Sequence, residues 1–272
     1  MVHIFFASVF QYNQKQKGDV KKLKNIIQKQ SPNFTAGRRT WTPDIIVNHI
    51  TDGHFPGSIN WVMNPAAKVS YHFMVSQTGE VYQMVNIVDT AWSNGTTTNG
   101  ANNDNRHSKI EAVRKRNVNA NLYTISIGYE GRHSITRGAL SPKQTEAGIS
   151  LMVHIRDEVQ NIWGEKIPLG NIVGHKDIAP LWRPHCPGTK FPRDVMVTQL
   201  QIRDDISNMG GKNNVPDRWA ADAWEWAQKE LRMDGTRPRD NMTRQEAMVL
   251  LKRLHRLTNE GTRFAGPEGL IS

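Results

Sequence analysis

Three short apolar runs divide the first two thirds of the chain and predict β-strands. They lie in residues 44–50, 123–127 and 172–174. Short runs of this kind, bounded by polar residues, are typical of strands that are buried in a sheet. The first run ends close to His49, and His175 follows the third directly. The pattern therefore predicts two strands that deliver an imidazole to the same edge of a sheet.

A helix with clear boundary signals is predicted over residues 141–162. Ser141 is suited to the N-cap, Pro142 to the first helical position, and Gln144 completes a capping box. Apolar residues then recur at helical spacing, at Ala147, Leu151, Ile155, Val159 and Ile162. We expect this helix to pack across the sheet as a structural element.

The chain changes character after residue 205. Residues 206–215 are rich in Asn and Gly and indicate a linker. Residues 216–258 contain two helical patterns, the second of which begins with the capping box Thr243 to Glu246. This helix, turn and helix resembles a single S-layer-homology motif, a module that binds secondary cell-wall polymers. About 45 residues bury little core alone, so the segment is either a structural cap or a wall-binding module.

The amino-terminal residues 1–32 are predicted to lie outside the main domain, which we place at residues 33–205. Residues 1–10 are apolar but too short for a membrane span, and no positive charge precedes them as in a secretory signal. Residues 19–30 are rich in lysine and are predicted to form a basic helix. We therefore expect synthesis in the cytoplasm and no membrane span.

The single cysteine lies in the most informative segment of the chain. Cys186 follows His175 in a stretch rich in turn-forming residues, and its thiol has no partner for an intramolecular disulfide. Imidazole and thiolate together suit Zn²⁺, and a catalytic zinc has three protein ligands and one open position. Histidines after apolar runs often serve packing alone, but the nearby cysteine favours one zinc bound by His49, His175 and Cys186.

Five blocks, in order, carry a resemblance to a known family. They are His49, residues 69–83 with Ser70-Tyr71-His72, Ala91-Trp92, residues 123–127, and Gly174-His175 with Cys186-Pro187-Gly188. Together they resemble the zinc-dependent N-acetylmuramoyl-L-alanine amidases of the peptidoglycan-recognition type, common in phage endolysins and bacterial autolysins. The resemblance covers roughly residues 33–200. It implies an α/β fold with a central mixed β-sheet flanked by helices, and one zinc in a groove.

The resemblance also implies how the site works. Amide hydrolysis needs an activated water, stabilisation of an oxyanion and a proton shuttle. Glu130, just beyond the strand at 123–127, is the predicted shuttle, although Gly128 stands where many relatives carry their catalytic glutamate. Arg183, shortly before Cys186, is the predicted cation that faces the substrate carbonyl.

Further side chains are predicted to border the substrate groove. Ser93 stands where relatives often carry a histidine after Ala-Trp, so substrate contacts there differ. His72 lies in a strand that the family shares but is not normally a zinc ligand there, which leaves core packing as the alternative. The predicted groove residues are His54, His72, Trp92, Ser93 and His185.

The predicted function is cleavage of the amide bond between N-acetylmuramic acid and L-alanine, which lyses the bacterial cell wall. A non-catalytic peptidoglycan-binding protein and a zinc peptidase acting on the stem peptide remain alternatives. The net charge of +10 and the pI near 9.8 predict an anionic partner. Anionic wall polymers fit this charge. No nucleic acid is expected, because the chain lacks a basic motif interleaved with aromatic residues.

Overall fold

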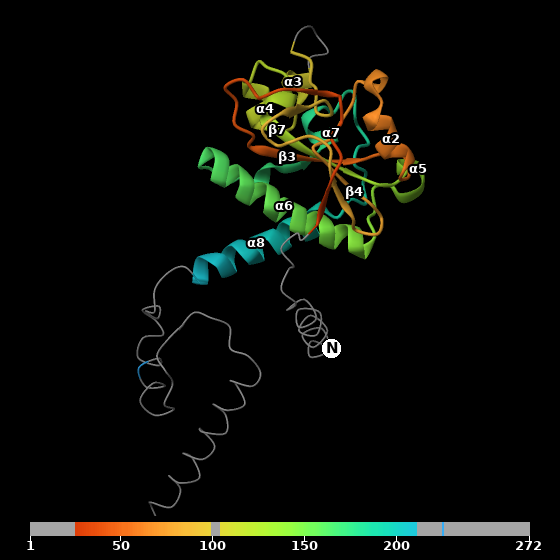
Figure 1. The fold of residues 1–272 in the computed structure, drawn as a ribbon. Coiled ribbons are helices and arrows are strands. Elements are labelled where there is room, and N and C mark those ends of the chain that lie inside the picture. The colour runs from red at the N-terminus through yellow and green to blue at the C-terminus, as the bar shows by residue number, and fades with distance from the viewer. Residues whose placement is uncertain (1–24, 99–103, 211–224, 226–272) are drawn as a thin grey trace, which may run out of the picture. The chain divides into compact units, whose positions relative to one another are not determined.

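The computed structural model describes residues 25–98, 104–210 and 225 (Figure 1). The chain divides into two compact units, residues 1–201 and residues 202–272. The predicted wall-binding module at 216–258 lies outside the described residues, apart from residue 225. None of the described helices combines the length and the apolar character needed to cross a bilayer.

A mixed six-stranded sheet forms the centre of the described part of the first unit. Its strand order is β1 (Ile26–Gln28), β5 (Val81–Gln83), β4 (Phe73–Val75), β7 (Thr124–Tyr129), β3 (Ile45–Ile50) and β8 (Ile172–Gly174). β5 runs antiparallel to β4, and the other neighbouring pairs are parallel. A separate small sheet pairs β2 (Phe34–Thr35) with β6 (Thr90–Ala91). The predicted central mixed sheet is confirmed.

Helices flank this sheet on both faces (Figure 1). One face is covered by α6 (Pro142–Trp163) and by the start of α8 (Arg193–Gly210). The other face carries α4 (Glu111–Lys115), α7 (His175–Ile178) and the 3-10 helix η2 (Ala120–Tyr123), with α3 (Asp104–His107) beside α4 and α7. The remaining elements are α2 (Gly57–Met63), α5 (His133–Thr136), η1 (Pro65–Ala67) and η3 (Leu169–Asn171).

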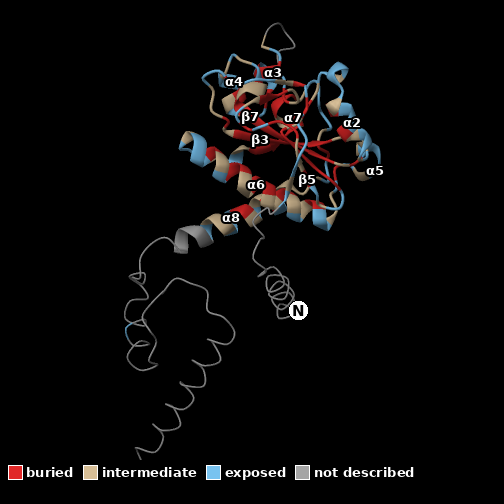
Figure 2. Cartoon of the chain, in the orientation of Figure 1, coloured by how far each residue is buried: buried red, intermediate tan, exposed pale blue. Residues whose placement is uncertain are grey.

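Alternation along β3 decides which face carries the functional groups. The strands form the buried centre of the domain (Figure 2). Ile46 and Ile50 pack in the cluster under α6, whereas Ile45 and Val47 pack against α4 and α7. Because successive side chains in a strand point to opposite faces, His49 lies on the side of Ile45 and Val47. The site therefore forms on the face opposite α6.

The neighbouring strand β7 follows the same rule. Its large apolar residues, Ile125, Ile127 and Tyr129, are buried in the cluster under α6. The alternate positions face the side of His49 and are small: Thr124, Ser126 and Gly128. This row of small residues leaves room for polar side chains from other elements above the sheet.

The predicted helix at 141–162 is confirmed as α6. Gln144 N donates to Ser141 Oγ at 3.1 Å, and Ser141 N donates to Gln144 Oε1 at 3.3 Å, which completes the capping box. Leu151, Ile155 and Val159 are buried against the sheet, as expected. Ile162, in the last turn of the helix, is half exposed.

Two predicted boundaries are wrong. Ile26–Gln28 form β1 and pair with Val81–Gln83 of β5, so the predicted basic helix does not run to residue 30 and the domain begins before residue 33. An edge strand of three residues depends on a distant partner, which the local lysine-rich pattern does not show. At the other end, α8 continues to Gly210, so residues 206–210 are helical rather than linker. The rest of the predicted linker and residues 19–24 lie outside the described residues.

Candidate metal centre

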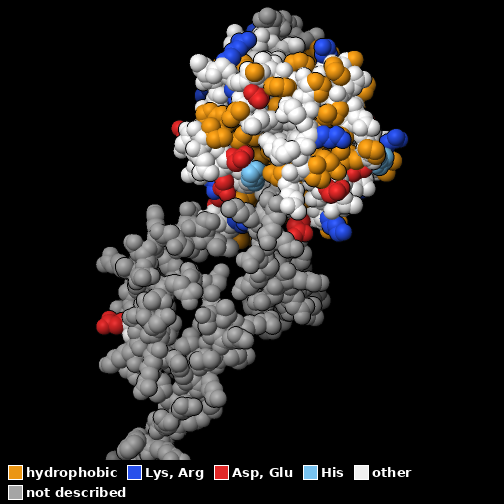
Figure 3. Space-filling model, viewed as in Figure 1, with side chains coloured by type: hydrophobic (Ala, Val, Ile, Leu, Met, Phe, Trp, Pro, Cys, Tyr) orange, Lys and Arg blue, Asp and Glu red, His pale blue; other side chains and the backbone are white. Residues whose placement is uncertain are grey.

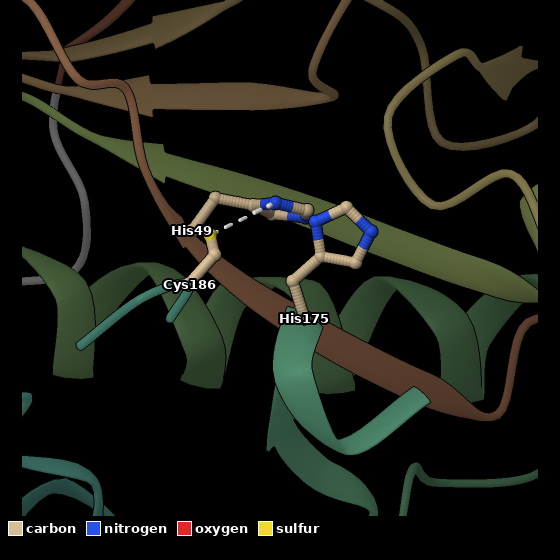
Figure 4. Close-up of side chains that lie close together, drawn as sticks. All are labelled: His49, His175 and Cys186. Atoms are coloured by element: carbon tan, nitrogen blue, oxygen red, sulfur yellow. Dashed lines mark hydrogen bonds between the residues drawn. The ribbon is translucent and has the colours of Figure 1, made fainter. Parts of the chain in front are cut away.

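Three predicted ligand residues meet at one edge of the sheet (Figure 4). The ligand atoms of His49, His175 and Cys186 all lie within 4.8 Å of one another. Cys186 Sγ lies 3.7 Å from His49 Nδ1, and the two imidazole centroids are 4.5 Å apart. The structure thus brings together, as predicted, three side chains that come from β3, α7 and a loop.

Strand register explains why the two histidines meet. β3 and β8 are parallel neighbours, and Asn48 pairs with Gly174. The residue that follows each of these two in the chain is a histidine, so His49 and His175 stand at the same level of the same edge. The prediction of two imidazoles at one sheet edge is confirmed.

Close packing of the loop brings in the cysteine. A Cβ at Gly174 would lie 2.6 Å from Pro187 Cδ, so only a glycine lets the loop approach the strand this closely. Lys176 N donates to Cys186 O at 2.8 Å and holds the loop in place. Glycine at 174 and proline at 187 therefore contribute directly to the position of the Cys186 thiol.

The cluster is electrostatically suited to a cation. Burial, with a smaller effect of the Arg183 charge, lowers the pKa of His49 to about 4. Burial first, then the neighbouring His49 and Arg183, lowers the pKa of His175 to about 2. Both imidazoles are therefore neutral near pH 7, the form that binds metals. Burial raises the pKa of the Cys186 thiol to about 11, so the thiolate forms readily only beside a bound cation.

We expect the metal-free protein to lose stability as the pH falls below the ordinary histidine pKa of 6.5. In the folded state the pKa values of His49, His72 and His175 lie below 6.5, so between this pH and the folded values the unfolded chain binds more protons. Above pH 6.5 these groups do not make the free energy of unfolding depend on pH. Urea unfolding in the presence of a chelator, at steps from about pH 7.5 to pH 4.5, measures the effect.

A matched pair of variants checks this slope. His175→Gln removes one of the three buried groups and should make the stability less dependent on pH. Trp182→Gln changes an exposed side chain that binds no proton, so it should leave the slope as in the unaltered chain. Equal slopes in all three proteins would contradict the assignment of the slope to the buried imidazoles.

A groove of about 980 Å³ opens over the cluster. Besides the three ligand residues, its walls include Tyr71, Trp92, Ser93, Arg183 and His185. A smaller arm of about 490 Å³, lined by residues that include His54, Trp61 and Arg132, shares Tyr71 with the main groove. On the face shown in Figure 3, the described Lys and Arg side chains are scattered among hydrophobic patches.

Comparison with known proteins decides the family. Residues 39–189 match the Amidase_2 family, described as N-acetylmuramoyl-L-alanine amidase. The chain belongs to the Amidase_2 family. N-acetylmuramoyl-L-alanine amidase A of Achromobacter lyticus is 32% identical over 99 residues, which are 36% of this chain and 41% of that protein. The chain thus spans less than half the length of this relative.

Solved structures of several amidases are also similar. A complex of the Escherichia coli N-acetylmuramyl-L-alanine amidase AmiD is 20% identical, with a TM-score of 0.46, over 78% of this chain and 79% of that chain. The endolysin N-acetylmuramoyl-L-alanine amidase LysCS of Clostridium intestinale is 17% identical, with a TM-score of 0.43, over 65% of this chain and 97% of that chain.

Three of the predicted groove residues, Trp92, Ser93 and His185, line the main groove of this Amidase_2 chain. Trp92 Nε1 donates to Thr35 Oγ1 at 2.9 Å, which fixes the indole at the wall. The ring of His185 stacks on His133, with centroids 5.5 Å apart. This pairing of a loop histidine with the first residue of α5 has no signal in the sequence.

His54 and His72 do not border the main groove. His54 lines the smaller arm, and its Nδ1 lies 3.5 Å from Glu130 Oε1. His72 is 1% exposed, accepts from Ser126 N at 3.0 Å and has Arg38 Nη2 at 2.7 Å from its Nε2. The groove prediction for His72 is therefore wrong, and this ring belongs to a buried polar cluster.

The structure does not bring Glu130 to the metal centre. Its two carboxylate oxygens accept from Phe55 N at 3.0 Å and from Gln77 N at 2.9 Å, and the side chain does not line the groove. Gly128, not Glu130, pairs with His49. Glu130 comes two residues later, which corresponds to about 6.6 Å along the strand direction, beyond the level of His49. The geometry therefore gives Glu130 the role of joining two loops.

Tyr71 is one site residue that the sequence did not indicate. A Cβ at Gly128 would lie 3.0 Å from Tyr71 Cδ2, so the tyrosine ring lies directly over this glycine. The ring centroid is 5.2 Å from that of His49, and Tyr71 lines both arms of the groove. Burial raises the pKa of Tyr71, so its hydroxyl keeps its proton. The signal in the sequence that could have indicated Tyr71 is Gly128, the glycine at the position where a glutamate is expected.

Arg183 lies in the groove wall next to the cluster. Its side chain is exposed, and its charge lowers the pKa values of both His49 and His175. Arg183 N donates to Ala179 O at 2.9 Å, which ties the loop that carries it to the end of α7. The structure thus places a cation in the wall of the groove that opens over the cluster.

Proposed function

We propose that this chain hydrolyses the amide bond between N-acetylmuramic acid and L-alanine in peptidoglycan, with one zinc ion held by His49, His175 and Cys186. The observation that carries the proposal is the cluster of two imidazoles and a thiol within 4.8 Å, in the groove of an Amidase_2 chain. Peptidoglycan is the substrate because the family is described by this amide bond.

The chemistry of the donor set supports zinc. Two neutral nitrogen ligands and one sulfur ligand are typical of Zn²⁺, and three protein ligands leave a position free for water, as catalytic zinc sites require. When bound, zinc would lower the pKa of its water, so that hydroxide able to attack an amide is available near neutral pH.

Two side chains are placed to stabilise negative charge on the scissile carbonyl. Tyr71, whose hydroxyl keeps its proton, lines the groove beside His49, and Arg183 adds a permanent cation to the wall of the same groove. Hydrogen-bond donors that are held in place before the reaction stabilise an oxyanion more than mobile ones do. Tyr71 and Arg183 therefore take the oxyanion role, and Glu130 supports the loops at residues 55 and 77.

The shape of the groove supports a branched substrate. The main groove and the smaller arm meet at Tyr71, next to the metal centre. A sugar with a peptide attached at the scissile bond extends in two directions from the reacting carbonyl. Exposed Trp182 in the main groove and Trp61 in the smaller arm offer apolar faces to both parts.

Digestion of purified peptidoglycan, with and without a zinc chelator, tests the function. We expect new L-alanine amino termini, identified by mass spectrometry, that disappear with chelator and return when zinc is added. Binding to the wall without new termini would instead indicate a non-catalytic binding protein. New termini within the stem peptide would indicate a zinc peptidase.

We further propose that the chain acts at the bacterial cell wall, where cleavage causes lysis, and that residues 216–258 add affinity for an anionic wall polymer. The net charge of +10 supports attraction to such polymers. Sedimentation with intact walls, and with walls stripped of anionic polymer, tests this. Equal binding to both preparations would exclude the polymer as a partner.

A further inference from the structure

We propose that Asn94 is a positioning residue that selects the tautomer of His49 and so keeps the Nδ1 lone pair ready for the metal. Its effect on metal affinity rests on the proposed zinc site. The tautomer itself is a property of the metal-free chain. Asn94 comes from the loop after β6, more than 40 residues from His49 in the sequence.

The contact between the two side chains is short and buried. His49 Nε2 lies 2.6 Å from Asn94 Oδ1, and the two residues are 2% and 1% exposed. A neutral imidazole carries one N–H, so a proton on Nε2 leaves Nδ1 as the lone pair. Nδ1 is the atom that faces Cys186 Sγ at 3.7 Å. The contact thus turns the metal-binding nitrogen toward the other ligands.

A second hydrogen bond determines which end of the Asn94 amide faces His49. Asn94 Nδ2 donates to Thr124 Oγ1 at 2.8 Å, and Thr124 Oγ1 donates its own proton to Ala120 O at 2.7 Å. The threonine hydroxyl has one proton and directs it to Ala120, so toward Asn94 it accepts only. The amide NH₂ must therefore face Thr124, and the amide oxygen faces the imidazole.

The backbone holds this amide in place independently of the imidazole. Asn94 N donates to Asn121 Oδ1 at 2.7 Å, so the loop keeps this anchor when the side chain of Asn94 is changed. Thr124 is the first residue of β7 and is fully buried. Buried hydrogen bonds of this kind do not compete with water, which makes the amide a rigid acceptor.

Loss of the acceptor has a defined consequence. Without Asn94 Oδ1, the Nδ1–H tautomer of His49 becomes populated, and in that form the nitrogen beside Cys186 carries a proton instead of a lone pair. Partners that orient metal-binding histidines are typically worth about 10- to 100-fold in metal affinity. We expect Asn94→Ala to weaken zinc binding by a factor in this range. Asn94→Asp keeps an oxygen acceptor and should retain tight binding.

Two measurements on the full chain test the inference. Long-range proton–nitrogen NMR of the metal-free protein identifies which ring nitrogen of His49 carries the proton. Competition with a chromogenic chelator then gives the zinc dissociation constant. We expect the Nε2–H tautomer in the unaltered protein and in Asn94→Asp, and a mixture in Asn94→Ala. Asn60→Ala, which truncates an exposed asparagine on α2, is the matched control and should keep the unaltered tautomer.

The outcomes separate this inference from the proposed function. An Nδ1–H tautomer in the unaltered protein, or an unchanged tautomer and zinc affinity in Asn94→Ala, would refute the role of Asn94. If Asn94→Ala changes the tautomer while even the unaltered protein binds no zinc, the orienting role stands and the zinc enzyme is refuted. The tautomer of His49 measured in the unaltered protein tests the role of Asn94 even where a variant does not fold.

Discussion

Cys186→Ser is expected to remove zinc from the purified protein and to lower the release of L-alanine amino termini by at least about 10³-fold, because water without the metal has a pKa near 15.7 instead of about 7. Serine preserves the shape of the side chain at this partly buried position but is a poor zinc ligand. The loss therefore reports on the sulfur and not on folding.

Zinc content by mass spectrometry and hydrolysis of purified peptidoglycan are the two readouts. His49→Ala should lose both zinc and activity in the same way. A variant with both substitutions should be no less active than either single one, because each change alone already removes the same zinc. His154→Ala is the matched control, since this histidine lies on α6, on the face of the sheet opposite the metal centre. Full zinc occupancy in Cys186→Ser would remove the thiol from the ligand set.

Tyr71→Phe should lower kcat by about 10²- to 10³-fold, the usual effect of removing one oxyanion donor. The substitution deletes only the hydroxyl, and the ring keeps its contacts with Gly128 and His49. Zinc affinity and KM should stay close to those of the unaltered protein. A loss in kcat alone separates a role in the transition state from a role in binding.

Glu130→Gln is the counterpart of this experiment. The substitution weakens the acceptors of Phe55 N and Gln77 N, so we expect a loss of about 1–3 kcal/mol in stability with kcat largely retained. The proton-shuttle role that the sequence predicts for Glu130 would give the reverse result, with turnover lost. A turnover loss in Glu130→Gln, with normal kcat in Tyr71→Phe, would restore Glu130 as the catalytic residue.

Gly128 explains why two polar residues compete for one role. Its place in β7 lies opposite His49, where a side chain would reach the metal centre directly. The ring of Tyr71 fills this space instead, and a Cβ at residue 128 would lie about 3 Å from three of its atoms. The tyrosine therefore occupies the place where many relatives, by the resemblance, carry a glutamate.

The sequence by itself determined the elements with strong local signals. Apolar runs predicted β3 and β8, and capping residues with helical spacing predicted α6. It also predicted the three residues that meet in the metal centre, because histidines near the carboxyl ends of two parallel strands lie at one edge of the sheet and a nearby cysteine favours zinc. These features follow from side-chain periodicity and from the chemistry of rare residue types.

Only the tertiary structure decided the rest. The short edge strand β1, the position of Glu130 at two backbone N–H groups, and the contact of Asn94 with His49 each join segments about 45 to 75 residues apart. No local pattern encodes such contacts, because they depend on the register of neighbouring strands and on the path of the loops between them. Residue types therefore predicted the metal centre, whereas strand register and loop packing decided which side chains surround it.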